Sequence, residues 1–246
     1  MCTLCTWQLP PKNISLSGDI VHVWRAELDQ TVQMRERLAA VLSEDELQRA
    51  EGFYLDRDRH RFIVGRGILR TILARYLNKE AREIKFCYGC RGKPALANSN
   101  KQLYFNVSHS GGIALYAIAH KREVGIDIEQ IREMPDAVAI ATQFFSEREN
   151  AALYALPAEQ RLQAFFHAWT RKEAYLKAKG DGLAQPLNSV EVSLAPGEPA
   201  QLLRIDGSPA AASRWALADI NPAPGFAAAL ATEAGNFSLA YWQWQS

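Results

Sequence analysis

Residues 124–129 have the sequence VGIDIE, which is the most informative stretch of the chain. Its apolar and polar residues alternate, which is typical of a strand. Because alternate side chains of a strand point to opposite faces, Asp127 and Glu129 share one face, roughly 7 Å apart along the strand. Two ionised carboxylates so placed repel each other unless a cation lies between them, and hard oxygen ligands suit Mg²⁺. The stretch therefore predicts a magnesium site, although an exposed strand with solvated acids has the same pattern.

A second stretch, WTRKEAYLK at residues 169–177, has the pattern of a helix. Residues spaced by four lie on one face of a helix, which aligns Trp169, Glu173 and Lys177. Glu173 is a candidate for a third carboxylate ligand, and Lys177 is a candidate for neutralising a phosphate. Lys172 projects to the flank of Glu173. An ordinary amphipathic helix with a Glu–Lys pair has the same spacing.

The rest of the chain predicts an α+β protein built from two similar subdomains. Long helices are expected at residues 59–77 and 161–179, and further helices are expected to begin at Ser43, where Glu46 completes a capping box, and within residues 145–148. Strands are expected at residues 20–28, 84–86, 103–108, 113–120, 123–129, 189–194, 202–205, 215–220, 227–230 and 239–244.

These elements divide the chain into three parts. We expect an extension over residues 1–18, an N-terminal subdomain over residues 19–122 and a C-terminal subdomain over residues 123–246. Each subdomain is expected to pack one long helix on an antiparallel sheet. The active site is expected to lie between the two subdomains.

Composition and charge exclude several classes of protein. The 246 residues are 48% hydrophobic and 22% charged, which is ordinary globular usage rather than that of a disordered or fibrous chain. With 28 Lys and Arg against 27 Asp and Glu, the net charge of +1 argues against binding nucleic acid by bulk charge, so an anionic ligand must meet a local cluster of bases. No apolar run is long enough to cross a membrane and the first residues have no secretory pattern, so we expect a cytoplasmic protein without a membrane partner.

Two short segments supply groups that can bind an anion. Residues 91–94, RGKP, combine the charge of Lys93 with a glycine that lets backbone N–H groups approach closely. Residues 106–110, NVSHS, contain Ser108 and His109, which can donate hydrogen bonds to phosphate oxygens. His109 can equally be a structural histidine. The chain has no Walker lysine motif and no Rossmann glycine motif after a strand, so nucleotide binding of those kinds is not supported.

The four cysteines form two Cys-x-x-Cys pairs, Cys2 with Cys5 and Cys87 with Cys90. This is the spacing of a zinc tetrad, so a structural Zn²⁺ that buttresses the RGKP loop is one hypothesis. A zinc-stabilised binding module without catalysis is the corresponding alternative function. Four unrelated thiols, kept reduced in the cytosol, are the other interpretation.

Taken together and in this order, the motifs RGKP, FNVSHS, VGIDIE and WTRKEAYLK resemble those of the 4′-phosphopantetheinyl transferase superfamily. The resemblance runs from about residue 44 to residue 194. It is to the larger, two-subdomain, surfactin-synthetase-activating type rather than the short trimeric type, and it includes cyanobacterial members with a helix like that of residues 53–70. It implies the fold of that superfamily, with a pseudo-two-fold arrangement of the subdomains, and a monomer.

The resemblance implies transfer of the 4′-phosphopantetheine arm of coenzyme A to a serine of an apo carrier protein, releasing adenosine 3′,5′-bisphosphate. Asp127, Glu129 and Glu173 would hold Mg²⁺ or Mn²⁺. Lys177 would touch the phosphates of coenzyme A, and Glu173, as ligand or through a water, would take the serine proton. The residues expected to bind coenzyme A are Arg49, Arg91, Gly92, Lys93, Asn106, Ser108, His109, Asp127, Lys172 and Lys177.

One position departs from the pattern of the superfamily. Arg49 matches the basic residue that binds the 3′-phosphate, whereas Glu46 stands where the superfamily has a second lysine. That part of the phosphate contact is therefore in question, and Arg61 is a candidate to supplement it.

The implied partners are carrier proteins or carrier domains of fatty-acid, polyketide or nonribosomal-peptide synthesis. We expect a carrier to dock on the second subdomain at residues 134–154, with Phe144, Phe145 and Leu153 exposed for contact. Such an apolar run can equally belong to the core. A carrier-binding relative without activity is a second alternative, and the intact Asp127, Glu129, Glu173 and Lys177 argue against it.

Overall fold

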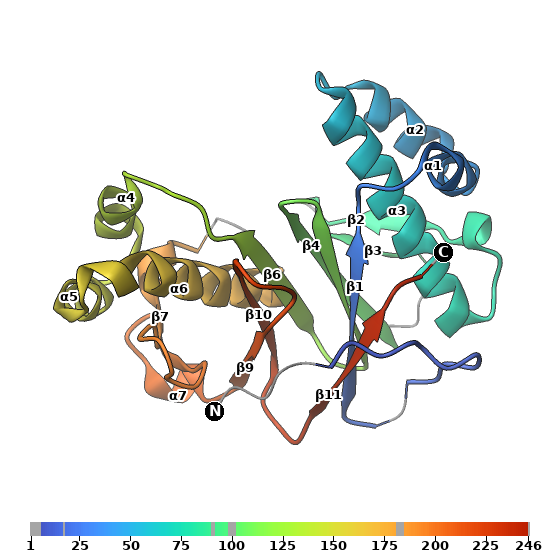
Figure 1. Cartoon of the computed structure of the whole chain (residues 1–246). Helices are drawn as coiled ribbons and strands as arrows, with labels where there is room; N and C mark the ends of the chain where they lie inside the picture. Colours follow the sequence, from blue (N-terminus) through green and yellow to red (C-terminus); the bar gives the residue numbers. More distant parts are fainter. Residues whose placement is uncertain (1–5, 17, 90–91, 98–101, 181–184, 246) are drawn as a thin grey trace.

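Two sheets stand side by side at the centre of the molecule, and a long helix covers the outer side of each (Figure 1). The computed structural model describes residues 6–16, 18–89, 92–97, 102–180 and 185–245. Its helices are α1 (Val32–Ala39), α2 (Glu44–Glu51), α3 (Asp56–Leu77), α4 (Ala137–Phe144), α5 (Glu147–Ala155), α6 (Ala158–Lys179) and α7 (Pro209–Ala212). Its strands are β1 (Ile20–Glu27), β2 (Phe86–Tyr88), β3 (Pro94–Leu96), β4 (Leu103–Ser110), β5 (Ile113–His120), β6 (Val124–Gln130), β7 (Val190–Val192), β8 (Leu202–Ile205), β9 (Trp215–Ile220), β10 (Phe226–Glu233) and β11 (Ser238–Gln243).

The described strands form two main sheets, with the orders β11-β1-β5-β4 and β6-β10-β9, and two short pairs, β2-β3 and β7-β8. Neighbouring strands of the main sheets are antiparallel except β1 and β11, which run parallel. Gln8 bridges Trp242 of β11, so both ends of the described chain lie at the sheet of the first half. β11, although it belongs to residues 123–246, therefore lies in the sheet of the first half, and the division near residue 122 stays a prediction.

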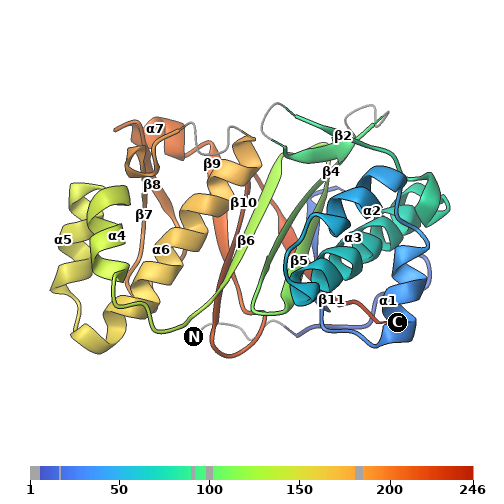
Figure 2. The same ribbon diagram turned by 90° about the horizontal axis from the view of Figure 1, so that it is seen from above.

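Three clusters of buried side chains hold the layers together. Figure 2 shows α6, the β6 sheet, the β4 sheet and α3 in succession across the molecule. One cluster joins α3 to the first sheet around Trp24 and Ile68, and a second joins α6 to the second sheet around Phe165. The third contains Val23 and Ile126 and lies between the two sheets. This shared core fixes the position of β6 relative to β4.

The expected α+β class, with long helices packed on antiparallel sheets, is confirmed. The capping boxes of Ser43 with Glu46 and of Ser146 with Glu149 are both present. The strand expected at residues 84–86 begins later, at Phe86, because the Ile84 carbonyl accepts a hydrogen bond from the buried Arg70 guanidinium (2.8 Å) instead of a strand partner. In the described part of the chain, no helix combines the length and the apolar character needed to span a bilayer.

Candidate active site

Asp127 lies at the centre of a group of charged side chains between β6 and α6. Its side chain is buried, and its Oδ1 atom accepts hydrogen bonds from Ser108 Oγ (2.9 Å) and Lys177 Nζ (2.5 Å). Its Oδ2 atom is also buried and has no hydrogen-bond partner among the described residues. A buried carboxylate oxygen without a partner is costly, so this atom is suited to bind a cation.

Gly125 explains how α6 can lie so close to β6. A Cβ atom at this position would lie 2.1 Å from Ala174 O and 2.2 Å from Ala178 N. Only glycine permits such an approach. Gly125 shares its face of β6 with the two carboxylates, because side chains alternate along a strand. The close approach therefore brings the helical turn with Glu173 and Lys177 alongside those carboxylates.

Glu129 and Glu173 complete the acidic group. Ser110 Oγ donates a hydrogen bond to Glu129 Oε2 (2.8 Å). Burial raises the pKa of Glu129, and the charge of Asp127 acts in the same direction. Burial also raises the pKa of Glu173, and the charges of Asp127 and Glu129 add to it. The three carboxylates are therefore near enough to repel one another, which favours a cation among them.

This donor set fits a hard divalent ion such as Mg²⁺, because it offers carboxylate oxygens and one of them is buried without a partner. The described residues contain no three His, Cys, Asp or Glu side chains that already stand in a shared coordination geometry. The Lys177 ammonium instead supplies the positive charge beside Asp127. Rotation of the carboxylates and of Lys177 would thus accompany binding of an ion.

A cavity of about 440 Å³ lies between α3, β4 and the loop before β3. His109 lines it, and the residues on either side of it in β4, Ser108 and Ser110, bind Asp127 and Glu129 of the acidic group. Desolvation is the main cause that lowers the pKa of His109, followed by the charges of Lys177 and Arg61. The basic side chains of the cavity are Arg49, Arg61, Arg66 and His109, and its aromatic side chains are Phe53, Phe62, Tyr88 and Tyr116.

Two of the three arginines in this cavity are bound to carboxylates. Arg61 makes a bidentate pair with Asp29 (2.7 and 2.6 Å), and Arg66 binds Glu46 (2.6 Å). Arg49 lies over an aromatic ring and has no carboxylate partner within the described ranges. The buried Glu46 is thus a partner of arginines rather than a phosphate contact, and Arg49 is the arginine whose full charge is available to an anion.

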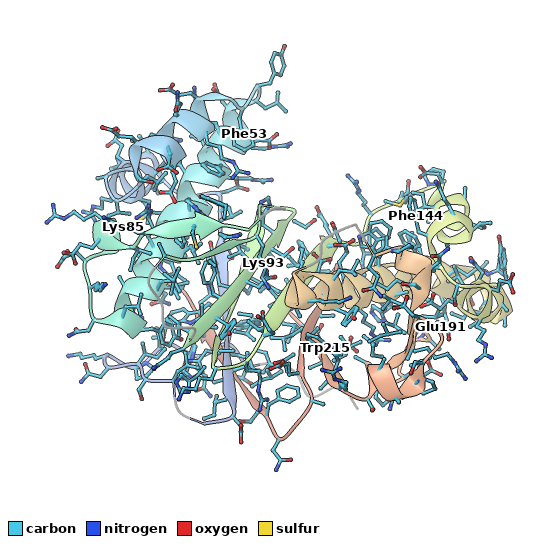
Figure 3. All side chains as sticks on the ribbon, turned by 180° about the vertical axis from the view of Figure 1, so that it is seen from behind. Phe53, Lys85, Lys93, Phe144, Glu191 and Trp215 are labelled. Atoms are coloured by element: carbon cyan, nitrogen blue, oxygen red, sulfur yellow. The ribbon has the colours of Figure 1, made fainter. Side chains whose placement is uncertain are left out.

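The RGKP segment is only partly described. Gly92 lines the cavity with a positive φ of 77°, and Arg91 lies outside the described residues. Lys93 Nζ donates to Ala178 O at the end of α6 (3.1 Å) and lies 3.5 Å from Glu123. Figure 3 shows Lys93 between the two halves of the molecule. Burial lowers the pKa of Lys93. Its expected contact with coenzyme A stays a prediction.

Lys172 does not join the site. Its side chain is completely buried, and Nζ donates to Glu149 Oε2 (2.6 Å), to Leu187 O (2.9 Å) and to Val190 O. Adjacent residues of a helix point about 100° apart, so Lys172 faces the core while Glu173 faces β6. The expected contact of Lys172 with coenzyme A does not agree with this placement, because all three protons of its ammonium already have acceptors.

The side chain of Asn106 is used in a hydrogen bond within the protein. Its Oδ1 atom accepts a hydrogen bond from Ile126 N (2.9 Å), and its side chain is buried. This places Asn106 at the contact between β4 and β6. Its side chain therefore joins the two strands, and its expected role in binding coenzyme A stays a prediction.

The expected carrier-contact residues are mostly in the core. Phe145 and Leu153 are 3% and 1% exposed, and Phe144 packs edge-on against Trp169. The expected exposure of Phe145 and Leu153 is wrong, because α4 and α5 fold them against α6, and the alternative that this run belongs to the core is confirmed for these two residues. Tyr154 remains exposed in this region.

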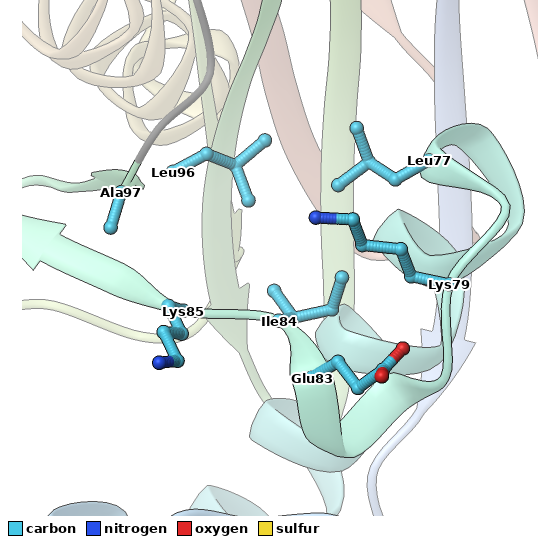
Figure 4. Close-up of a pocket in the computed structure, with 7 residues that line it drawn as sticks. All are labelled: Leu77, Lys79, Glu83, Ile84, Lys85, Leu96 and Ala97. Atoms are coloured by element: carbon cyan, nitrogen blue, oxygen red, sulfur yellow. The ribbon is translucent and has the colours of Figure 1, made fainter.

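The cysteine hypothesis rests mainly on residues outside the described ranges, namely Cys2, Cys5 and Cys90. Cys87 is exposed, and its Sγ atom lies 3.6 Å from Ala95 O. A second cavity, of about 290 Å³, lies at the end of α3 near Leu77, Lys79 and Ile84 (Figure 4). None of the expected site residues lines it.

Two contacts of charged side chains, one in the site and one in the core, were not expected from the sequence. Ser110 binds Glu129, and Glu149 neutralises Lys172. The first could have been found from the spacing of two residues that Ser108 and Ser110 share with Asp127 and Glu129 on a neighbouring strand. The second has only a weak signal, because a glutamate in a capping box is ordinarily exposed.

Comparison with known proteins identifies the family. A model described as the 4′-phosphopantetheinyl transferase superfamily matches residues 123–231, and one described as 4′-phosphopantetheinyl transferase, N-terminal, matches residues 24–121. The chain is 43% identical to the 4′-phosphopantetheinyl transferase HetI of a Nostoc species over 97% of this chain and 98% of that protein. It is 32% identical to the 4′-phosphopantetheinyl transferase Sfp of Bacillus subtilis over 65% of this chain and 69% of that protein.

A solved structure is also similar in part. The holo-[acyl-carrier-protein] synthase of Thermotoga maritima matches 46% of this chain and 64% of its own, with 20% identity and a TM-score of 0.35. The family follows from the sequence matches, which cover nearly the whole chain. The chain belongs to the 4′-phosphopantetheinyl transferase superfamily.

Proposed function

We propose that this protein transfers the 4′-phosphopantetheine group of coenzyme A to a serine of an apo carrier protein, and that the reaction depends on Mg²⁺. The buried, unpartnered Oδ2 atom of Asp127 beside Lys177 and two further carboxylates is the observation that carries the proposal. The cavity of His109 and Arg49 opens next to it. An acidic cation site beside a basic cavity suits a diphosphate ester that carries a further phosphate.

The chemistry assigns distinct tasks to the residues of the acidic group. The serine oxygen forms a bond to the β-phosphorus of coenzyme A, and the bond from that phosphorus to the bridging oxygen breaks, which releases adenosine 3′,5′-bisphosphate. Asp127, Glu129 and Glu173 would hold Mg²⁺, which supplies charge neutralisation at the diphosphate when bound. Glu173, directly or through a water, takes the serine proton. Lys177 donates to phosphate oxygens.

Binding of coenzyme A relies on local charge, since the chain has a net charge of +1. Arg49 and His109 face the cavity and can donate to a phosphate. Arg61 is already bound to Asp29, whereas Arg66 shares the single carboxylate of Glu46 with Arg70 and so keeps part of its charge for the cavity. Recognition of the 3′-phosphate then depends mainly on Arg49, because Glu46 is turned toward Arg66 and Arg70.

We also propose where the carrier docks. The proposed docking surface is still formed by residues 134–154 and their neighbours, but the side chains that contact the carrier differ from those expected. An apolar groove of about 460 Å³ lies between α4 and α6, lined by Met134, Pro135, Val138, Leu162 and Phe165, with Glu133 and Arg161 also on its lining. An apolar groove beside two helices is a kind of surface that accepts the apolar face of a partner's helix, and the proposed occupant is a helix of an apo carrier protein.

The finer points of the proposal are a cytoplasmic monomer that accepts Mg²⁺ or Mn²⁺ and acts on carriers of fatty-acid, polyketide or nonribosomal-peptide synthesis. A panel of apo carriers tests the specificity for the carrier and for the metal. Each carrier is incubated with the protein, coenzyme A and either metal, and the product is weighed by mass spectrometry. Carriers that gain the mass of one phosphopantetheine group are substrates, and failure of every carrier contradicts the proposed function.

A further inference from the structure

β4 and β6 lie side by side without belonging to one sheet in the described part of the chain (Figure 2). Polar side chains of β4 join them instead, at every second residue. Asn106 Oδ1 accepts from Ile126 N (2.9 Å), Ser108 Oγ from Ile128 N (3.4 Å) and Ser110 Oγ from Gln130 N (3.1 Å). This side-chain ladder supplies partners to three backbone N–H groups of β6 that would otherwise be unsatisfied at the edge of its sheet.

The two serines of the ladder have a second contact. Ser108 Oγ donates to Asp127 Oδ1 (2.9 Å), and Ser110 Oγ donates to Glu129 Oε2 (2.8 Å). A hydroxyl has one proton. Because the backbone N–H of β6 must be the donor in its bond to each serine, that single proton is left for the carboxylate. The ladder therefore fixes the direction of both serine–carboxylate hydrogen bonds.

This arrangement holds one oxygen atom of each carboxylate and leaves the other for a ligand. The effect is larger for Glu129, because a glutamate side chain has one more rotatable bond than an aspartate and loses more conformational entropy when it is ordered. The Asp127 carboxylate accepts a further hydrogen bond from Lys177. Among the described residues, only Ser110 donates a hydrogen bond to the Glu129 carboxylate. Groups that bind and orient metal ligands commonly change metal affinity by about 10–100-fold when they are removed.

We propose that Ser110 is a positioning residue for the divalent-ion site, which it serves by orienting the Glu129 carboxylate from the neighbouring strand. This inference rests on the proposed function, since it assumes that Glu129 binds the ion. The side-chain ladder between β4 and β6 then has a second role, which is to orient a metal ligand. Ser108 and Ser110 lie on the strand that carries His109, so the same strand positions the acidic group and lines the basic cavity.

The test measures metal binding by the full chain without coenzyme A or carrier. Mn²⁺ is the probe, because the electron paramagnetic resonance signal of the free ion reports binding directly. S110A is expected to bind Mn²⁺ about 10-fold more weakly than the wild type. S110T keeps the hydroxyl and is expected to bind like the wild type. S213A removes an exposed hydroxyl from a turn after α7 and is the matched control.

A double-mutant cycle separates positioning from folding. In E129Q the ligand is altered, so adding S110A is expected to cause little further loss of Mn²⁺ affinity. Thermal unfolding of each variant is measured in parallel. Unchanged Mn²⁺ binding in S110A overturns the inference whatever its melting temperature, as does an S110A effect of equal size in the E129Q background. If the wild type itself binds no Mn²⁺, the metal site of the proposed function fails instead.

Discussion

The ammonium of Lys177 on α6 lies 2.5 Å from Oδ1 of Asp127 on β6, and Ser108 on β4 binds both groups. Three elements from the two halves of the chain thus meet at one charged contact. A hydrogen bond between an ammonium and a buried carboxylate is charge-assisted and stronger than one between neutral groups. It joins α6 to β6. The same contact must open if Asp127 binds a metal ion and Lys177 binds a phosphate.

Replacing Asp127 by Asn tests this contact in the reaction. The change keeps the size of the side chain but removes its charge, so both the cation site and the partner of Lys177 are lost. We expect kcat/KM to fall about 10²-fold or more with the fold unchanged. Steady-state transfer to an apo carrier and circular dichroism measure the two effects. D45N, at an exposed acidic position of α2, is the control. An active D127N protein would contradict the assignment.

The buried pair of Lys172 and Glu149 predicts a loss of stability rather than of binding. Removing one partner leaves a charge without compensation in the core, which typically costs about 3–5 kcal/mol. K172M and E149Q are therefore each expected to lower the free energy of unfolding in urea. The double variant should recover part of that loss. A stable K172M protein that no longer binds coenzyme A would instead support the contact first expected for this lysine.

Gly125 predicts that a single methyl group can displace α6. G125A places a Cβ atom 2.1 Å from Ala174 O, so either the helix or the strand must shift. We expect a loss of about 1–3 kcal/mol in stability from overpacking. Activity should fall further than stability explains, because Glu173 and Lys177 move with the helix. G52A, whose nearest contact would be 3.4 Å, is the matched control and should resemble the wild type in both measurements.

His22 predicts how stability depends on pH. Burial lowers its pKa from 6.5 to about 4, and it shares a hydrogen bond with Tyr76 Oη (2.7 Å). Between these two values the unfolded chain binds more protons than the folded one. The contribution of neutral His22 to the free energy of unfolding is therefore fully present above pH 6.5. It is lost as the pH falls toward 4, by up to about 3 kcal/mol.

H22Q is the variant that isolates this effect. Its stability, measured by urea unfolding at several pH values, should change less than that of the wild type between pH 4 and 6.5. Equal slopes for the two proteins in that interval would show that another group is responsible.

The sequence predicted the parts of the fold and site that depend on local pattern. The alternation of residues 124–129 and the spacing of Glu173 and Lys177 each follow from the geometry of one element, and the structure brings them together. Gly125 shows why. Its small size, visible in the sequence, allows the close packing that joins the two motifs.

The parts that could not be predicted depend on contacts between distant segments. Lys172 was expected in the site because it is next to Glu173, but its buried partner Glu149 lies 23 residues earlier in the chain. Phe145 was expected at the surface because nothing local shows that α4 and α5 fold back on α6. The pairing of β11 with β1 likewise joins the two ends of the chain. Such contacts are set by the packing of whole elements rather than by sequence pattern.

The central claim is that the three carboxylates and Lys177 act together on coenzyme A. Transfer to an apo carrier protein, followed by mass spectrometry with and without Mg²⁺, tests it most directly. We expect the carrier to gain one phosphopantetheine group at its serine only when metal is present, and none when Asp127 is replaced by Asn. Modification of the carrier at an undiminished rate after all divalent metal is removed by a chelator would contradict the account.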